Sequence, residues 1–233
     1  MLDSFKLEKA PDNLFCIPNF VTEEEEENTL RNIYKAPKPK WTNLLNRRLQ
    51  NWGGLPKPKA KGQMIAENIP NWLQTHIDKV HQLGIFGDEN TTKPNHVLIN
   101  EYEPGQGISP HLDGSLFYPT IATISLGSHT VLNFYEPLSD QEMSDSCCSS
   151  LEDRLKLKIY IPRRSLILIQ DQMFHHYLHG IEEIKEDSCD SNLIVPPQID
   201  IKEISLKRET RVSLTIRHVP NTKKIKNLFG GKF

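Results

Sequence analysis

Long apolar runs are missing from this 233-residue sequence, and no stretch approaches the roughly 18 apolar residues that a membrane-spanning helix needs. Residues 1–9 alternate charged with single apolar side chains and lack the apolar core of a signal peptide. We therefore expect a protein that is neither membrane-spanning nor secreted. Disorder throughout is also excluded, because 37% of the residues are hydrophobic and 25% are charged, as in ordinary globular proteins.

Cysteine is scarce as well. The four cysteines, Cys16, Cys147, Cys148 and Cys189, lack the paired C-x2-C spacing of zinc sites, which favours a reduced intracellular compartment. A net charge of -2 gives no global basic field, so any attraction to nucleic acid must come from local patches. Nothing in the composition forces a division of the chain, and we treat residues 1–233 as a single domain.

Two helices are expected in the first third of the chain, after a strand-like apolar stretch at residues 14–20. Thr22 can cap a helix with an acid-rich first turn, and we interpret residues 23–27 as its solvated start. A second helix is predicted over residues 70–83, because Pro70 suits a first helical position and apolar residues follow at helical spacing.

From residue 96 onward, short apolar runs alternate with turn residues, which is typical of a β sandwich or jelly roll. The expected strands are residues 96–102, 120–126, 130–135, 156–161, 166–170 and 210–218. Residues 139–155 and 182–207 are polar and are expected to be loop insertions. The predicted fold class is mainly β with flanking α, with the N-terminal helices packed on a sheet.

His111 and Asp113 lie two residues apart, and side chains at this spacing in an extended segment project from one face, so both can bind one ion. This pattern alone is weak, because nine histidines and many aspartates make a chance pair common. His179 offers a third ligand, and its neighbour Gly180 lets the backbone approach a metal closely. Two histidines and one carboxylate leave open the three positions on Fe(II) that a 2-oxo acid and oxygen need.

Residues 211–217 alternate with period two, which places Arg211, Ser213, Thr215 and Arg217 on one face and three aliphatic residues on the other. Two arginines that face one way inside a strand are costly unless they meet anions. A dicarboxylate cosubstrate supplies such anions, and the guanidinium fork binds carboxylates in a bidentate manner. The alternative is an amphipathic edge strand with its arginines in water.

Residues 96–102 show the same alternation, with Asn100 and Tyr102 on one face. Both side chains can hydrogen-bond a bound acid. Without the other motifs they would be ordinary strand residues.

The combined order of four motifs resembles the AlkB family of Fe(II)- and 2-oxoglutarate-dependent dioxygenases, over residues 15–220. These motifs are Asn100 with Tyr102, His111 with Asp113, His179 with Gly180 and Ile181, and the run from Arg211 to Arg217. Residues 36–41, 49–54 and 123–131 add to the likeness. The resemblance implies that the jelly roll is a double-stranded β-helix.

The resemblance also implies the cofactors Fe(II), 2-oxoglutarate and O2. The implied iron ligands are His111, Asp113 and His179. The implied cosubstrate contacts are Asn100, Tyr102, Arg211 at the distal carboxylate, Ser213, and Arg217 near the metal-bound end. Ser213 departs from the asparagine that is usual in the family, which removes an amide that could bond the cosubstrate or its neighbours. The implied reaction yields succinate and hydroxylates a substrate C–H; an N-methyl group would leave as formaldehyde.

In AlkB-like proteins the region before the β-helix forms a lid over a nucleobase. Here residues 35–62 are rich in Lys, Arg and Pro and lack acidic residues, so we predict a basic loop that contacts nucleic acid. The predicted contacts are Lys38, Lys40, Trp41, Arg47, Arg48 and Trp52, with phosphate contacts also from Lys57, Lys59 and Lys61. Further phosphate contacts near the end of the chain could come from Lys223, Lys224, Lys226 and Lys232. The alternative is a solvated loop whose tryptophans are anchored in the core.

The leading hypothesis is a dioxygenase that demethylates an alkylated base in RNA or DNA, taken as a single strand or a flipped base. One alternative is a nucleic-acid-binding protein with little or no catalysis, motivated by Ser213 and the long insertions. Another is a protein-side-chain hydroxylase, because many oxygenases share the same set of iron ligands and the fold does not choose a substrate. We expect a monomer in the cytoplasm and nucleus, without a membrane partner.

Overall fold

The computed structural model describes residues 2–11, 13–57, 63–87, 91–139 and 149–224. Several residues singled out above lie outside these ranges: Lys59, Lys61, Lys226, Lys232, Cys147 and Cys148. In the described part, no helix is long and apolar enough to cross a membrane.

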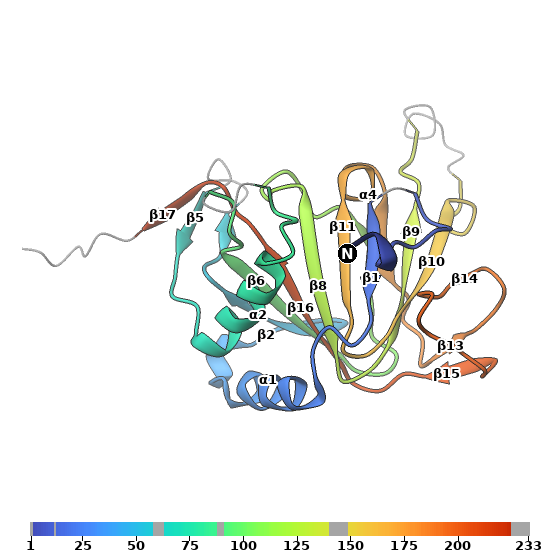
Figure 1. The fold of residues 1–233 in the computed structure, drawn as a ribbon, viewed down its shortest axis with the longest axis horizontal. Coiled ribbons are helices and arrows are strands. Elements are labelled where there is room, and N and C mark those ends of the chain that lie inside the picture. Colours follow the sequence, from blue (N-terminus) through green and yellow to red (C-terminus); the bar gives the residue numbers. More distant parts are fainter. Residues whose placement is uncertain (1, 12, 58–62, 88–90, 140–148, 225–233) are drawn as a thin grey trace, which may run out of the picture.

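The larger of two main sheets has seven strands in the order β1-β11-β8-β16-β6-β3-β2, each antiparallel to its neighbours (Figure 1). Their bounds are β1 Leu14–Ile17, β2 Thr42–Leu44, β3 Arg47–Trp52, β6 His96–Tyr102, β8 Thr120–Leu126, β11 Leu166–Gln170 and β16 Arg211–Arg217. The predicted strands 96–102, 120–126 and 166–170 are confirmed at both ends, and β16 is one residue shorter at each end than predicted.

The smaller main sheet has five strands in the order β14-β10-β9-β12-β7, and only the β10–β14 pair within it is parallel. Their bounds are β7 Ile108–His111, β9 Thr130–Tyr135, β10 Leu155–Ile161, β12 Leu178–Ile181 and β14 Leu193–Ile194. The strand predicted at 130–135 is confirmed, and β10 begins one residue earlier than predicted.

Residues 182–207 are not a plain loop, so that prediction is wrong. β13 (Glu186–Ser188) pairs with β15 (Ser205–Lys207), and β14 extends the smaller main sheet. A buried ion pair anchors the segment, because Arg208 donates to both carboxylate oxygens of Asp187 at 2.7 and 2.6 Å. The polar composition that suggested a loop therefore includes Asp187, which is buried because Arg208, just after the segment, neutralises it.

The prediction that the basic segment 35–62 is a loop is also wrong. Within it, β2 and β3 extend the larger sheet, because the prolines of the segment flank β3 and leave its backbone N–H groups free to pair with β6. A third, three-stranded sheet follows, in the order β17-β5-β4. Its bounds are β4 Pro56–Lys57, β5 Gln63–Ala66 and β17 Thr222–Lys224.

The first predicted helix, α1 (Glu23–Lys35), begins with the capping box expected of its sequence. The Glu25 N–H donates to the Thr22 hydroxyl at 3.1 Å, and the Thr22 N–H donates to the Glu25 carboxylate at 2.7 Å. The second, α2 (Asn71–His81), begins one residue later than predicted, because Pro70 has an extended conformation and is the N-cap. Shorter helices are η1 Leu2–Phe5, η2 Lys38–Lys40 and α4 Asp171–His175.

Each face of the larger sheet is covered by a core. The two main sheets face each other across a cluster that includes Leu14, Ile121, Phe134, Ile159, Ile167 and Ile169. On the outer face, α1 and α2 pack against the sheet through a cluster that includes Ile33, Leu73, Ile77, Val97, Ile124 and Leu214. The predicted jelly roll with helices packed on a sheet is therefore confirmed.

Glu26 corrects the prediction that the acidic start of α1 is simply solvated. Its side chain is fully buried and accepts hydrogen bonds from the Arg163 Nε–H at 2.8 and 2.9 Å. It also accepts the backbone N–H of Gly127 at 2.7 Å. Glu26 therefore ties α1 to the end of β8 and to the β10–β11 turn.

Replacing Glu26 with alanine should lower the free energy of unfolding by about 1–3 kcal/mol, because the Gly127 N–H and the Arg163 guanidinium lose their common acceptor. Glu24, an exposed residue of the same helical turn, provides the control, and Glu24→Ala should change it by less than about 0.5 kcal/mol. Urea unfolding of both variants measures the difference. Equal losses would show that Glu26 contributes only as a helix-start acid.

Candidate functional site

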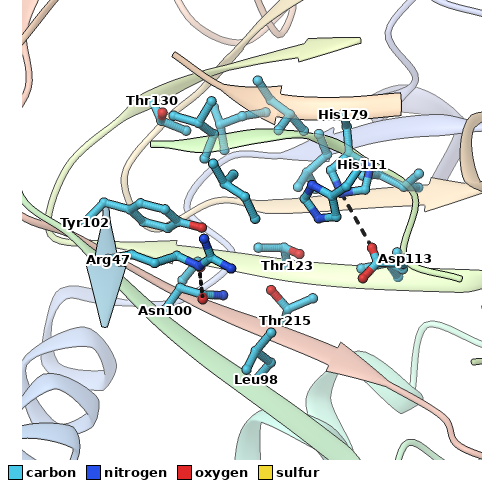
Figure 2. Close-up of a pocket in the computed structure, with 18 of the residues that line it drawn as sticks. Arg47, Leu98, Asn100, Tyr102, His111, Asp113, Thr123, Thr130, His179 and Thr215 are labelled. Carbon is cyan, nitrogen blue, oxygen red and sulfur yellow. Dashed lines mark hydrogen bonds and ion pairs between the residues drawn. The ribbon is translucent and has the colours of Figure 1, made fainter. Parts of the chain in front are cut away.

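Two histidines face each other across a pair of strands (Figure 2). β7 and β12 are antiparallel, and their register sets His111 opposite His179 with ring centroids 4.5 Å apart. Asp113 lies two residues beyond the end of β7, and one of its carboxylate oxygens is 3.5 Å from His179 Nε2. The fold thus brings together the three residues predicted as iron ligands, although Asp113 follows the strand and is not part of it.

Metal binding requires a neutral imidazole ring with a free nitrogen, and the surroundings of His179 favour that form. Burial lowers the pKa of His179 to about 4, against a smaller opposing effect of Asp113, so its ring is neutral at neutral pH. His111 Nδ1 is 2.9 Å from the Ser109 carbonyl oxygen. Since a carbonyl only accepts, His111 Nδ1 carries a hydrogen, which leaves Nε2 as the ring nitrogen that can face a metal.

The third candidate ligand, Asp113, forms an ion pair with Arg217, and both side chains are buried. Arg217 in turn lies 4.6 Å from the centre of the Phe117 ring. Among the described residues, no three His, Cys, Asp or Glu side chains converge as they do around a bound ion, and one oxygen of Asp113 is engaged by Arg217. The donor set itself, two imidazoles and one carboxylate, fits Fe(II).

A cavity of about 520 Å³ between the two main sheets connects these three residues with the polar faces of β6 and β16. From these two strands it is lined by Leu98, Asn100, Tyr102, Arg211, Ser213, Thr215 and Arg217. The aliphatic residues that alternate with them on β16 face α1 and α2 in the outer core. The predicted alternation is confirmed, and the alternative of an edge strand is wrong because β16 lies between β8 and β6.

Arg211 is a buried cation without a carboxylate partner in the described part of the chain. Its Nε–H and Nη2–H donate to the Ser125 hydroxyl at 3.1 and 2.8 Å, and its guanidinium lies 5.7 Å from the Tyr102 ring centre. Burial lowers the pKa of Arg211 to about 10, so the group remains charged at neutral pH. A buried charge of this kind needs an anion, and the cavity gives an anion access to it.

Asn100 and Tyr102 line the same cavity as Arg211, as predicted. Burial raises the pKa of Tyr102, so its hydroxyl remains a hydrogen-bond donor at neutral pH. The Asn100 side-chain oxygen accepts a hydrogen bond from the Arg47 Nε–H at 3.2 Å, and Ser213 lies opposite Asn100 in the register of β16 and β6. The five predicted cosubstrate residues therefore share one cavity.

Comparison with known protein families gives one match that covers most of the chain. The model of the 2OG-Fe(II) oxygenase superfamily matches residues 13–217. The chain belongs to this superfamily. It is therefore a dioxygenase that requires Fe(II), 2-oxoglutarate and O2, as predicted.

Relatives of this oxygenase identify the AlkB family within the superfamily. A zebrafish (Danio rerio) protein named "Probable RNA/DNA demethylase ALKBH6" is 45% identical over 232 residues, which cover 99% of this chain and 95% of that protein. "Uncharacterized protein L905" of Acanthamoeba polyphaga mimivirus is 30% identical, over 94% of this chain and 91% of that protein. The mouse tRNA (carboxymethyluridine(34)-5-O)-methyltransferase ALKBH8 is 26% identical, over 91% of this chain but 31% of that protein.

Solved structures share the fold of this oxygenase at low sequence identity. OsALKBH1 superposes with a TM-score of 0.53 at 13% identity, over 88% of this chain and 97% of that chain. A Pseudomonas putida prolyl-4-hydroxylase gives a TM-score of 0.53 at 11% identity, over 94% of this chain and 99% of that chain. These likenesses support the jelly-roll architecture.

The residues predicted to contact nucleic acid do not form one exposed surface. Arg48 donates to both oxygens of the buried Glu101, at 2.6 and 3.0 Å, and lies 4.1 Å from the Trp41 ring centre. Lys40 lies 4.2 Å from the Trp52 ring centre. Both tryptophans are half-buried and pack against the outer core, as in the alternative prediction, although Trp52 lies in β3 and Trp41 directly precedes β2, so neither lies in the solvated loop of that alternative.

Lys38 is exposed, whereas Arg47 lines the cavity instead of the outer surface. This position of Arg47 was not predicted, although the alternation of β3 sets it on the face opposite to Arg48. Leu98, which alternates with Asn100, and Ser125, which alternates with Thr123 on β8, were not predicted either.

Gly180 allows the close approach of β12 to β7 that pairs the two histidines. A methyl group at this position would lie 2.9 Å from the Ile108 carbonyl oxygen and 3.0 Å from the Pro110 nitrogen, both of them backbone atoms. Gly180→Ala should therefore separate the strands and weaken Co(II) binding about tenfold or more, measured by the visible absorption of the bound ion.

Gly84→Ala is the control for Gly180→Ala. Gly84 has a φ of +68°, so an alanine there is strained, but no atom lies within 4 Å of the added methyl group and Gly84 does not line the cavity. It should cost about 1 kcal/mol of stability and leave Co(II) affinity unchanged. Unchanged affinity in Gly180→Ala would mean that this contact does not set the spacing of the histidines.

Proposed function

We propose that this dioxygenase oxidises an N-alkylated base in RNA or DNA, with His111, Asp113 and His179 as its iron ligands. The observation that carries the proposal is one cavity that joins the histidine pair to Arg211, which is buried and has no carboxylate partner among the described residues. A dianionic cosubstrate that binds a metal at one end and a guanidinium at the other matches this arrangement.

Arg211 pairs with the distal carboxylate of 2-oxoglutarate in this proposal, and the Tyr102 hydroxyl and Asn100 amide donate hydrogen bonds to the cosubstrate. Arg217 orients Asp113 and lies near the metal-bound end of the cosubstrate. Ser213 contributes a small hydroxyl to the same wall of the cavity.

When bound, iron and 2-oxoglutarate supply the activation of O2 that hydroxylates a substrate carbon. The apolar residues that line the cavity, including Leu132, Ile167 and Ile169, exclude water from that reaction. A hydroxylated N-methyl group then leaves as formaldehyde.

Nucleic acid as the substrate is supported by the name of the zebrafish relative, which designates a probable RNA/DNA demethylase. The cavity lies inside the protein, so a base must be unstacked from its neighbours to reach the histidines, which favours a single strand or a flipped base. We further propose that the protein is a monomer that acts in the cytoplasm and nucleus, where such substrates are found.

The cosubstrate site is tested by anaerobic titration of the Fe(II)-loaded protein with 2-oxoglutarate, monitored by the visible charge-transfer band of the chelated keto acid. Arg211→Ala should weaken 2-oxoglutarate binding at least about tenfold, because a charge-assisted bidentate contact is lost. Arg31→Ala removes an exposed arginine from α1 and should leave the titration unchanged. A wild-type protein without the band would overturn the assignment of the site.

The metal ligands are tested by succinate release from 2-oxoglutarate under air. His111→Ala and Asp113→Ala should each abolish Fe(II)-dependent succinate formation, because two ligands no longer hold the ion in a reactive geometry. His176→Ala is the matched control: His176 is exposed and close in sequence to His179, and its side chain contacts Glu136 outside the cavity. Full turnover in either ligand variant would contradict the assignment.

A further inference from the structure

Arg47 is a cation that the cosubstrate chemistry does not use. It lies on β3, in the lid-like segment, and the strand's alternation points it away from the outer core and into the cavity. Figure 2 shows its guanidinium beside Tyr102 and Asn100, directed toward the space bounded by Thr123 and Thr215. Arg47 therefore reaches the cavity from the side of the lid, where a substrate would enter.

Arg47 and its neighbour Arg48 differ in whether a carboxylate neutralises their charge. Arg48 is neutralised by Glu101, whereas no ion pair joins Arg47 to a carboxylate anywhere in the described part of the chain. The hydrogen-bonding partner of Arg47 is the neutral amide of Asn100. Its charge is thus available to a ligand in the cavity.

The charged side chains of the cavity lining leave it with a positive excess. Its described lining contains three arginines, Arg47, Arg211 and Arg217, but one carboxylate, that of Asp113. Fe(II) and dianionic 2-oxoglutarate cancel each other's charge, so the loaded cavity keeps an excess of two positive charges. In a partly dehydrated cavity this excess repels a cationic group and favours a neutral group with hydrogen-bond acceptors.

We propose that Arg47 determines substrate specificity: it donates to an acceptor atom of a neutral N-alkylated base and discriminates against bases that methylation makes cationic. This inference rests on the proposed nucleic-acid substrate. The guanidinium is suited to the task because all of its donors are N–H groups and it stays protonated. The hydroxyls of Thr123 and Thr215, which line the same space, are neutral and cannot offset its charge.

Two isomeric bases test the proposal directly. Each base carries one methyl group, on N6 or on N1. At neutral pH N6-methyladenine is neutral, whereas 1-methyladenine holds one more proton and is cationic. Each is placed once in the same short single-stranded RNA, and binding to the anaerobic protein loaded with Fe(II) and 2-oxoglutarate is measured by fluorescence anisotropy. The wild type should bind the neutral strand about tenfold more tightly, as expected for one poorly screened charge contact.

Variants of Arg47 separate this role from general attraction to the strand. Arg47→Gln should bring the ratio of the two affinities close to one, Arg47→Glu should invert it, and Arg47→Lys should largely retain it. Lys38→Gln removes the same charge from an exposed position of the segment, so it should weaken both strands equally and leave the ratio unchanged.

Two outcomes would overturn the inference: the wild type binds the cationic strand as tightly as the neutral one, or the ratio survives in Arg47→Gln. In the second case, weaker 2-oxoglutarate binding by Arg47→Gln in the charge-transfer titration would make Arg47 a cosubstrate residue. Failure of the proposed function looks different: the charge-transfer band forms, but neither methylated strand binds better than the unmodified strand.

Discussion

The structure depends on one strand, β16, that is buried on both faces and carries two kinds of side chain. Its aliphatic residues hold α1 and α2 against the larger sheet, while its arginines and hydroxyls form a wall of the cavity. Burying an ion such as the Arg211 guanidinium without a carboxylate opposes folding, and hydrogen bonds to Ser125 offset part of that cost. The central position of β16 thus keeps a cation where an anion, once bound, would stabilise the folded protein.

The candidate iron site joins the two main sheets, and this explains why neither sheet forms it alone. The smaller sheet supplies the two histidines through the β7–β12 register, whereas Arg217, which holds Asp113, comes from the larger sheet. The Arg217 guanidinium is itself packed on Phe117, in the connection between β7 and β8. Any change in the spacing of the sheets therefore alters the orientation of the carboxylate relative to the imidazoles, so the packing of the core and the geometry of the site are coupled.

Much of the fold could be predicted because its signals are local. Strands such as β8, β9 and β11 are apolar runs bounded by turn residues, and the capping box of α1 lies within four residues. The segment 182–207 could not be predicted, because Asp187 is buried only through Arg208 and His129, which are distant in sequence. In the site, spacing identified His111 with Asp113 and Arg211 with Arg217. Ser125 had no such signal, since its role depends on lying beside Arg211 in the paired strand.

Arg47 and Arg48 differ in their surroundings in a way that the composition of the segment does not indicate. In the sequence they are two adjacent members of one basic cluster, and a count of charges treats them alike. The pleat of β3 separates them: Arg48 faces outward, where Glu101 and Trp41 satisfy it, and Arg47 faces the cavity, where its partner is an amide. The lid-like segment is therefore not a uniform phosphate-binding patch. One of its arginines, Arg48, stabilises the attachment of the segment to the sheet, and the other, Arg47, contributes to the electrostatic potential of the cavity.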